Sequence, residues 1–133
     1  MLAEDVHDGV ATLTLARAER GNALSPELVD ALLAAVARHC GAADVHTLAL
    51  AGDGRHFCTG FDLSDLDACS DGDLLARFVR IEALLAALWH APVRTVAAAR
   101  GRAWGAGADL FAACDLRIAA PDASFRFPGA GFG

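Results

Sequence analysis

Apolar and polar residues alternate along this chain with two different periods, and the changes of period divide it into strands and helices. Residues 10–15, VATLTL, have the period of two that is typical of a strand, and the preceding Asp8-Gly9 pair is typical of a hairpin turn. After Ser25 and Pro26, which suit the start of a helix, apolar residues recur every three or four positions. The predicted apolar side of this helix consists of Leu28, Ala31, Leu32, Ala35, Val36 and His39.

The rest of the chain continues the alternation of strands and helices. Residues 46–52 are short and almost entirely apolar, as in a strand buried on both faces, and a helix is predicted at 73–90, before Pro92. The stripe of that helix consists of Leu74, Phe78, Ile81, Leu85 and Leu88. The remaining elements are a strand at 94–100, a short helix at 106–114 and strands at 115–120 and 124–127. This order predicts one α/β domain, residues 1–133, with a mostly parallel sheet.

Composition and charge exclude several classes of protein. The chain has 133 residues, of which 55% are hydrophobic and 21% charged, a globular balance. Its net charge of −6 argues against nucleic acid as a partner. We expect a cytoplasmic protein without a membrane partner, because no long apolar run and no signal-peptide pattern occur. The four cysteines lack metal-ligand spacing, so reduced thiols and no metal are expected.

The positive charges are of one kind, because all eleven basic residues are arginine. A bias of composition would produce this usage. A preference for phosphate groups would produce it as well, because the guanidinium group binds phosphate with two hydrogen bonds. Both explanations stay open at this point.

Two loops follow the ends of predicted strands, where ligands bind in α/β sheets. They are GDGRHFCTGFDLSDL at 52–66 and GRAWGAGADL at 101–110. Both are rich in small residues, which let a ligand approach main-chain N–H groups. Their glycines fit neither a dinucleotide-binding motif, nor a P-loop, nor a nucleophile elbow. Side by side, the loops would offer two N–H groups to one developing oxyanion.

These motifs resemble those of the enoyl-CoA hydratase/isomerase (crotonase) superfamily. HFCTGFDLSDL is similar to its F-x-x-G-x-D-[IL] segment, and RGNALSPELVDAL to its N-A-L-[NS] helix start. RGRAWGAGADLFAACDLRIAAPDASFRFP is similar to its G-x-[AC]-x-G-[GA]-G-x-[ED]-L-x-x-x-C-D segment followed by A-x-F-x-x-P. The resemblance spans nearly the whole chain. It implies a crotonase-like ββα spiral that binds acyl-CoA thioesters and stabilises an enolate-like oxyanion with two backbone amides.

The resemblance also assigns roles to particular residues. It implies that the oxyanion amides belong to Phe61 and Ala106 and that Asp109 is the candidate acid or base. It places the adenine end of coenzyme A near residues 54–59, where Arg55 either faces phosphate or only belongs to a solvated turn. The residues implied to bind the coenzyme A part of the substrate are Arg55, Phe57, Thr59, Gly60 and Gly105. No prosthetic group is expected, since coenzyme A arrives with the substrate.

The chain departs from the family pattern in two ways. Family hydratases act on water with two glutamates, and the corresponding positions here are Asp109 and Gly129, with no glutamate after Glu82. A single carboxylate suits proton shuttling or isomerisation better than hydration by a pair of glutamates. The chain also stops where family members continue, so the resemblance implies a domain that lacks the usual C-terminal half. It implies a trimer-based homo-oligomer if the fold is completed.

Three functions stay open. The first is an enzyme acting on acyl-CoA thioesters, of the hydratase/isomerase kind. The second is an inactive truncated homologue that binds coenzyme A or pairs with a longer family member, motivated by the missing glutamate and the missing half. The third is thioester hydrolysis or dehalogenation on the same amides. Asp62, Asp65 and Asp67 are a weak signal for it, because a solvated acidic loop also explains them.

The remaining candidate residues have two interpretations each. Asp109 lies in the first turn of a predicted helix, where the helix start lowers its pKa and burial beside a thioester would raise it. Its alternative role is to stabilise the helix end. His56 and His90 are interpreted as packing or surface residues. Trp104 and Phe61 either line an acyl pocket or pack in the core.

Overall fold

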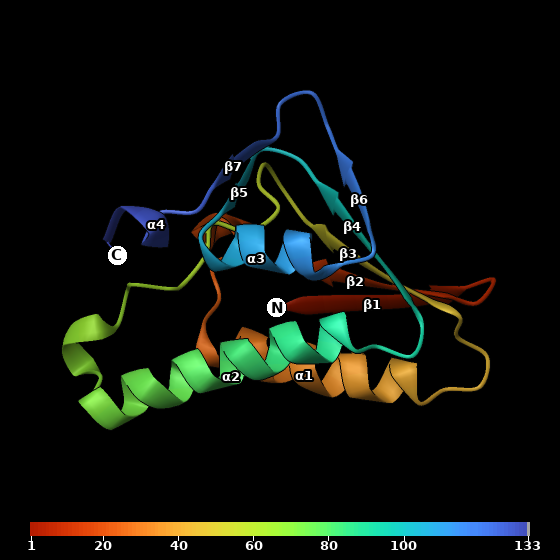
Figure 1. Ribbon diagram of the computed structural model, residues 1–133, viewed down its shortest axis with the longest axis horizontal. Coiled ribbons are helices and arrows are strands. Elements are labelled where there is room, and N and C mark those ends of the chain that lie inside the picture. Colours follow the sequence, from red (N-terminus) through yellow and green to blue (C-terminus); the bar gives the residue numbers. More distant parts are fainter. Residues whose placement is uncertain (133) are drawn as a thin grey trace.

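The computed structural model describes residues 1–132 and contains a mostly parallel sheet with two long helices packed below it (Figure 1). The sheet has five strands in the order β1-β2-β3-β4-β6, of which β1 is antiparallel to β2 and the others are parallel. These strands are β1 (Leu2–His7), β2 (Val10–Leu15), β3 (Thr47–Gly52), β4 (Arg94–Ala99) and β6 (Leu116–Ala119). The prediction of an α/β fold with a mostly parallel sheet is confirmed.

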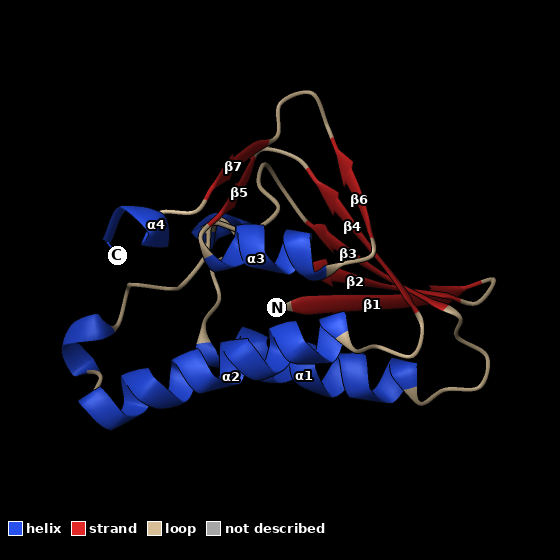
Figure 2. Cartoon of the chain, in the orientation of Figure 1, coloured by secondary structure: helices blue, strands red, loops and turns tan. Residues whose placement is uncertain are grey.

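A second, two-stranded parallel sheet lies beyond the ends of the large one (Figure 2). It pairs β5 (Arg102–Trp104) with β7 (Ser124–Arg126). The helices are α1 (Pro26–Cys40), α2 (Asp71–Trp89), α3 (Ala106–Ala113) and α4 (Gly129–Phe132), with short 3-10 turns at Ala18–Arg20 and Leu66–Ala68. The strand β5 was not predicted, because three residues are too few for a periodic pattern and their pairing partner comes twenty residues later.

Local sequence signals explain where the first elements begin. Asp8 and Gly9 both have positive φ angles, 49° and 78°, as a two-residue hairpin turn between β1 and β2 requires. The Ser25 hydroxyl accepts a hydrogen bond from the Leu28 N–H (3.2 Å), and Pro26 is the first residue of α1. The hairpin and the helix start are therefore confirmed.

The buried sides of the two long helices follow the predicted stripes with several differences, among them the burial of Leu84 in place of Leu85 in α2. In α1 the buried residues are Leu28, Val29, Leu32, Ala35, Val36 and His39, so Val29 takes the place of Ala31. In α2, Ile81, Leu84 and Leu88 are buried, whereas Phe78 is 56% exposed. Phe78 belongs to the predicted stripe but is not buried, because its ring stacks on that of Phe61 in the loop beside α2.

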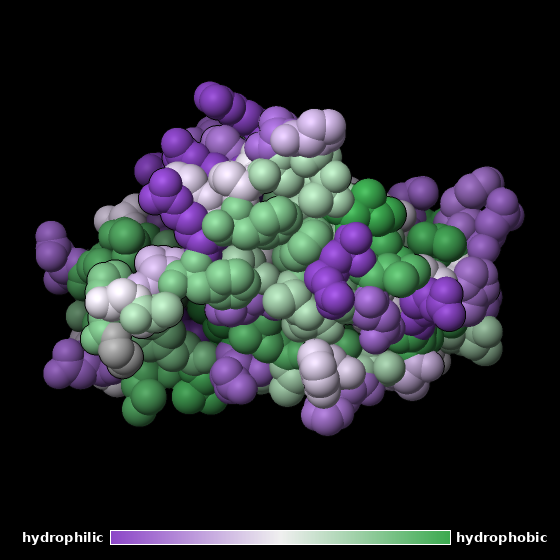
Figure 3. Space-filling view, turned by 45° about the horizontal axis from the view of Figure 1, so that its top comes forward, coloured by the Kyte–Doolittle hydropathy of each residue, from purple (hydrophilic) through white to green (hydrophobic). Residues whose placement is uncertain are grey.

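Exposed hydrophobic side chains gather at one end of the molecule, over α4 and the first turns of α2 (Figure 3). They include Leu75, Phe78, Val79, Phe127 and Phe132.

None of the helices within residues 1–132 is long and apolar enough to cross a membrane.

Candidate active site

The first candidate oxyanion donor is the main-chain N–H of Phe61. The Leu24 N–H donates to the Gly60 carbonyl (2.7 Å), and the Asp62 N–H donates to the Leu24 carbonyl (3.3 Å), so a parallel bridge pairs Leu24 with Phe61. Polar groups of successive residues point to opposite sides of such a bridge. The Phe61 N–H therefore points away from Leu24, and it has no hydrogen-bond acceptor among residues 1–132.

The second candidate donor is the N–H of Ala106, the first residue of α3. The first N–H groups of a helix have no acceptor within the helix. Gly105 precedes it with φ 55° and ψ −125°, a conformation that favours glycine. The chain thus turns sharply at Gly105, and the start of α3 presents its N–H groups beside the turn.

The two loops touch each other through glycine. A Cβ atom on Gly60, whose φ is +103°, would lie 2.7 Å from the Trp104 carbonyl oxygen and 3.5 Å from the Ala106 nitrogen. A Cβ atom on Gly107 would overlap the carbonyl oxygen of Cys58. Only residues without side chains at both positions allow this approach, so the amides of Phe61 and Ala106 belong to one site.

A cavity of about 520 Å³ opens at these amides. It brings Phe61, Ala106 and Asp109 together, as the resemblance implies, and adds Gly105 and the start of α4. The other lining residues come mainly from α2 and the segment before α4: Phe78, Ile81, Glu82, Leu85, Phe127, Pro128, Gly129 and Ala130. The lining is largely apolar, with Asp109 and Glu82 as its carboxylates.

Asp109 is electrostatically suited to holding or releasing a proton. Burial raises the pKa of its carboxyl above the usual value, and the nearby charge of Glu82 raises it further. The sequence left open whether the helix start or burial would prevail at this carboxyl. Burial prevails, so the carboxyl ionises less readily than a free aspartate.

Two side chains of α2 contact the Phe61 ring and hold it in place. The Arg77 guanidinium lies 3.9 Å from the centre of the Phe61 ring, and the Phe78 ring stacks on it at 4.8 Å. Arg77 also donates to the carbonyl of Asp62 (2.8 Å) and approaches that of Leu24 (3.5 Å). The sequence analysis did not identify Arg77. A charged residue in an amphipathic helix gives no indication that it contacts a loop that comes well before the helix in the sequence.

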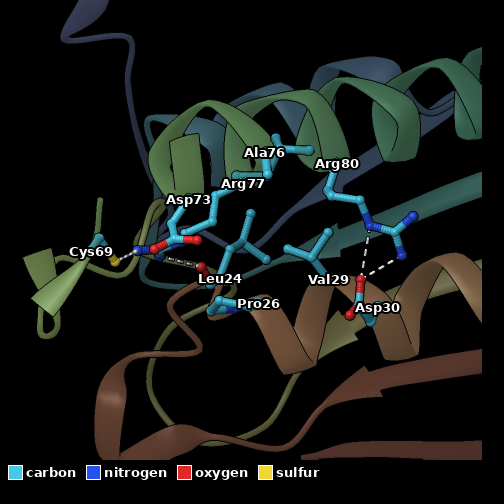
Figure 4. A pocket seen from close by; sticks show the side chains of 10 residues that line it. Leu24, Pro26, Val29, Asp30, Cys69, Asp73, Ala76, Arg77 and Arg80 are labelled. Atoms are coloured by element: carbon cyan, nitrogen blue, oxygen red, sulfur yellow. Dashed lines mark hydrogen bonds and ion pairs between the residues drawn. The ribbon is translucent and has the colours of Figure 1, made fainter. Parts of the chain in front are cut away.

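Arg77 also lines a second cavity, of about 450 Å³, between α1 and α2 (Figure 4). There the Arg77 guanidinium lies 3.9 Å from the Cys69 sulfur, and Arg80 donates to Asp30 (2.9 Å). The Arg80–Asp30 contact ties α2 to α1, and the Arg77–Cys69 contact ties α2 to the loop before it. Phe61 is not among the residues that line this second cavity.

A buried polar cluster holds the Phe61 loop from below. Asn22 is fully buried, and its side-chain amide donates to the carbonyls of Asp53 (2.9 Å) and His56 (2.8 Å). Arg17 pairs with the Asp62 carboxylate at 2.7 Å. Asp62 thus has a structural partner and does not line the cavity, so the structure gives no support to it as a nucleophile.

Asp62 makes the stability of the loop depend on pH. Burial opposes its ionisation, but the Ser64 amide and hydroxyl and the Arg17 guanidinium outweigh burial and lower the pKa to about 2. Because the folded pKa lies below the ordinary 3.8, the stabilisation is complete above that value and is lost as the pH falls toward 2.

We expect Asp62→Asn to lower the free energy of unfolding at pH 7 by about 3 kcal/mol, because it leaves Arg17 without its buried partner. Urea unfolding at pH 7 and pH 2.5 measures this. The difference from wild type should shrink at the lower pH. Asp65→Asn, an exposed neighbour, is the control. Equal stability of wild type and Asp62→Asn at pH 7 would contradict the role of the ion pair.

The residues predicted to bind coenzyme A lie in different surroundings. Arg55 is exposed on its turn, and its charge, with that of Arg102, adds to the burial that lowers the pKa of His56. Thr59 is half-buried, with its N–H bonded to the Gly21 carbonyl (3.1 Å). The Phe57 side chain is fully buried in the core, so its predicted contact with coenzyme A would have to come from its main chain and stays a prediction.

The remaining candidates fall outside the cavity. Asp65 and Asp67 are exposed on the loop before α2. The Trp104 ring lies beside the guanidinium groups of Arg102 (4.4 Å) and Arg126 (4.6 Å) and donates to the Ser124 hydroxyl (2.9 Å). Trp104 therefore does not line the acyl pocket proposed from the sequence.

The histidines and cysteines add no further site. The His56 ring accepts a hydrogen bond from the Arg102 N–H (3.0 Å), so its role here is in packing. Within the described part of the chain, no group of three or more His, Cys, Asp or Glu residues could hold a metal ion.

Comparison with known proteins identifies the family. The sequence profile described as enoyl-CoA hydratase/isomerase matches residues 5–133. The chain belongs to the enoyl-CoA hydratase/isomerase family. The Mycobacterium tuberculosis protein named "Probable enoyl-CoA hydratase echA6" is 40% identical over 128 residues, which are 95% of this chain and 49% of that protein. The chain thus spans about half the length of the curated relatives that it matches first.

Solved structures of this family have the same fold. A Bordetella parapertussis protein assigned as an enoyl-CoA hydratase/isomerase is 48% identical, with a TM-score of 0.95 over 99% of this chain and 55% of its own. The enoyl-CoA hydratase of Bacillus anthracis is 27% identical, with a TM-score of 0.94 over 99% of this chain and 52% of its own. The crotonase-like fold of this family member is therefore confirmed.

Proposed function

We propose that this member of the enoyl-CoA hydratase/isomerase family binds acyl-CoA thioesters and stabilises the enolate formed when a proton leaves the carbon next to the thioester. One observation carries the proposal. The unpaired N–H groups of Phe61 and Ala106 meet at a cavity whose lining includes the Asp109 carboxyl. Hydrogen bonds from fixed amides to a developing oxyanion are among the strongest contributions to catalysis.

The proposed reaction begins with a proton transfer. The thioester carbonyl accepts hydrogen bonds from the two amides, and Asp109, in its ionised form, takes a proton from C2. The electron pair of the C–H bond then forms the enolate, and its charge moves to the carbonyl oxygen. A carboxyl whose pKa is raised is a stronger base once ionised, which supports Asp109 in this role.

Arg55 supports the proposal at the other end of the substrate. It lies exposed near His56 and Arg102, where positive charges from separate segments come together. We assign to this region the phosphate groups of coenzyme A, because guanidinium groups bind phosphate with paired hydrogen bonds.

Binding and chemistry can be tested separately on the 133-residue chain. We expect coenzyme A and butyryl-CoA to raise the thermal unfolding midpoint, since a ligand that binds only the folded state stabilises it. In D₂O, NMR should then detect exchange of the C2 protons of butyryl-CoA in the presence of the protein. Binding without exchange would favour a non-catalytic role in coenzyme A binding, and neither binding nor exchange would contradict the proposal.

A further inference from the structure

A second carboxylate lies in the candidate active site, on an element that the sequence motifs do not include. Glu82 of α2 lines the 520 Å³ cavity together with Phe61, Ala106 and Asp109. It also lines a groove of about 400 Å³ that continues between α2 and α3, again with Asp109. The two carboxylates therefore share both hollows, although 27 positions separate them in the sequence.

The surroundings leave Glu82 available for chemistry. It makes no hydrogen bond or ion pair with any of residues 1–132, in contrast to Glu4, which is bound by Arg38 and His39. The groove beside it is otherwise lined by Leu85, Ala86, Trp89, His90, Ala112 and Ala113. Glu82 is exposed on α2 and has no partner within the described residues, so its carboxylate is accessible to a ligand in these hollows.

One further titratable side chain lines these hollows. Within the cavity and the groove, the titratable side chains are Asp109 of α3, Glu82 of α2 and His90, which follows the last residue of α2. The strands packed against α3 carry Arg102, whose guanidinium lies on Trp104, and Arg94, which lines a separate hollow near His46.

We propose that Glu82 is a catalytic residue that works with Asp109 as an acid–base pair at the same cavity. The inference rests on the proposed function, because it concerns the same thioester. Family hydratases have a second glutamate at the position of Gly129. In this chain, Glu82 of α2 would supply the second carboxylate instead. A carboxylate beside Asp109 opposes the ionisation of the Asp109 carboxyl. The charge of Glu82 already raises the pKa of Asp109.

The pair suits movement of a double bond. The ionised member takes a proton from C2 of a 3-enoyl-CoA, and the electron pair forms a dienolate whose oxygen accepts hydrogen bonds from the two amides. The protonated member then gives its proton to C4, and the double bond comes to lie between C2 and C3. Water returns the proton from the first carboxyl to the second, so the enzyme ends as it began.

Glu82→Gln separates this role from the rest of the site. We expect isomerisation of a short 3-enoyl-CoA to fall by about 100-fold, because one member of the acid-base pair is lost. Exchange of the C2 protons of butyryl-CoA involves Asp109 and the amides directly, so it should fall less than isomerisation does. Glu27→Gln, the same change of charge at an exposed site on α1, is the control and should affect neither.

A second measurement does not depend on turnover. NMR titration of the Asp109 carboxyl carbon should show a lower pKa in Glu82→Gln than in wild type and no change in Glu27→Gln. An unchanged Asp109 pKa, or isomerisation by Glu82→Gln at the wild-type rate, overturns the inference. A wild-type chain that exchanges C2 protons but moves no double bond also overturns it and leaves the proposed function intact. Failure to exchange at all overturns both.

Discussion

Asp109→Asn is expected to reduce exchange of the C2 protons of butyryl-CoA by about 100-fold to 10,000-fold, the range of a lost general base. Asparagine keeps the shape of the side chain but cannot take a proton. In wild type, exchange should fall as the pH drops through the Asp109 pKa, because only the ionised carboxyl acts as a base. That pKa is raised, so the fall should come at a higher pH than for a free aspartate. Rates measured from pH 4 to pH 8 test both points.

The stability of the same variant shows whether a loss of activity is chemical. The raised pKa means that ionised Asp109 is less favourable in the folded protein than in the unfolded chain. We therefore expect Asp109→Asn to unfold at the same temperature as wild type or higher at pH 7. An inactive variant with a much lower midpoint would indicate misfolding, and an active one would exclude Asp109 as the base.

Gly60→Ala is expected to reduce exchange by about 100-fold or more, comparable to the loss of one oxyanion donor. Its φ of +103° is unfavourable for alanine, and the new Cβ atom would press against the Trp104 carbonyl and the Ala106 nitrogen. The loop must move, which separates the Phe61 amide from the Ala106 amide. The strain should also lower the free energy of unfolding by about 1–3 kcal/mol.

Gly72→Ala is the matched control for that substitution. Gly72 lies in the first turn of α2, and its nearest neighbour for a new Cβ atom is the Ser70 oxygen at 3.8 Å. Alanine should be tolerated there and is expected to stabilise the helix by up to about 1 kcal/mol. Exchange by Gly60→Ala at the rate of Gly72→Ala would contradict the role of the Phe61 loop.

Most of the fold was predictable, because its signals are local. The period of residues 10–15 and the cap at Ser25 depend on neighbours a few positions away, and both predictions are confirmed. Phe57 shows the limit of such signals. Its loop has no regular period, so the sequence did not indicate which side chains point into the core. Phe78 shows a similar limit, because its stacking on Phe61 depends on where α2 crosses that loop.

The sequence predicted the main-chain amides of the candidate site but not the side chains of α2 that surround them. Glycines stand next to Phe61 and Ala106 in the sequence, so the motif itself indicates which main-chain N–H groups are accessible to a ligand. Arg77 and Glu82 reach the site only because α2 packs against both the Phe61 loop and α3. Contacts of that kind depend on the whole fold, and one sequence does not contain a pattern for them.

The oxyanion donors of this site are main-chain groups, and this determines which mutational methods can detect them. Alanine scanning would find Asp109 but not the donors, because Phe61→Ala keeps its N–H and residue 106 is already alanine. Replacing the amide linkage by an ester removes the N–H itself and leaves the side chain unchanged. In this family member, the contribution of each donor can therefore be measured by backbone chemistry and not by side-chain substitution.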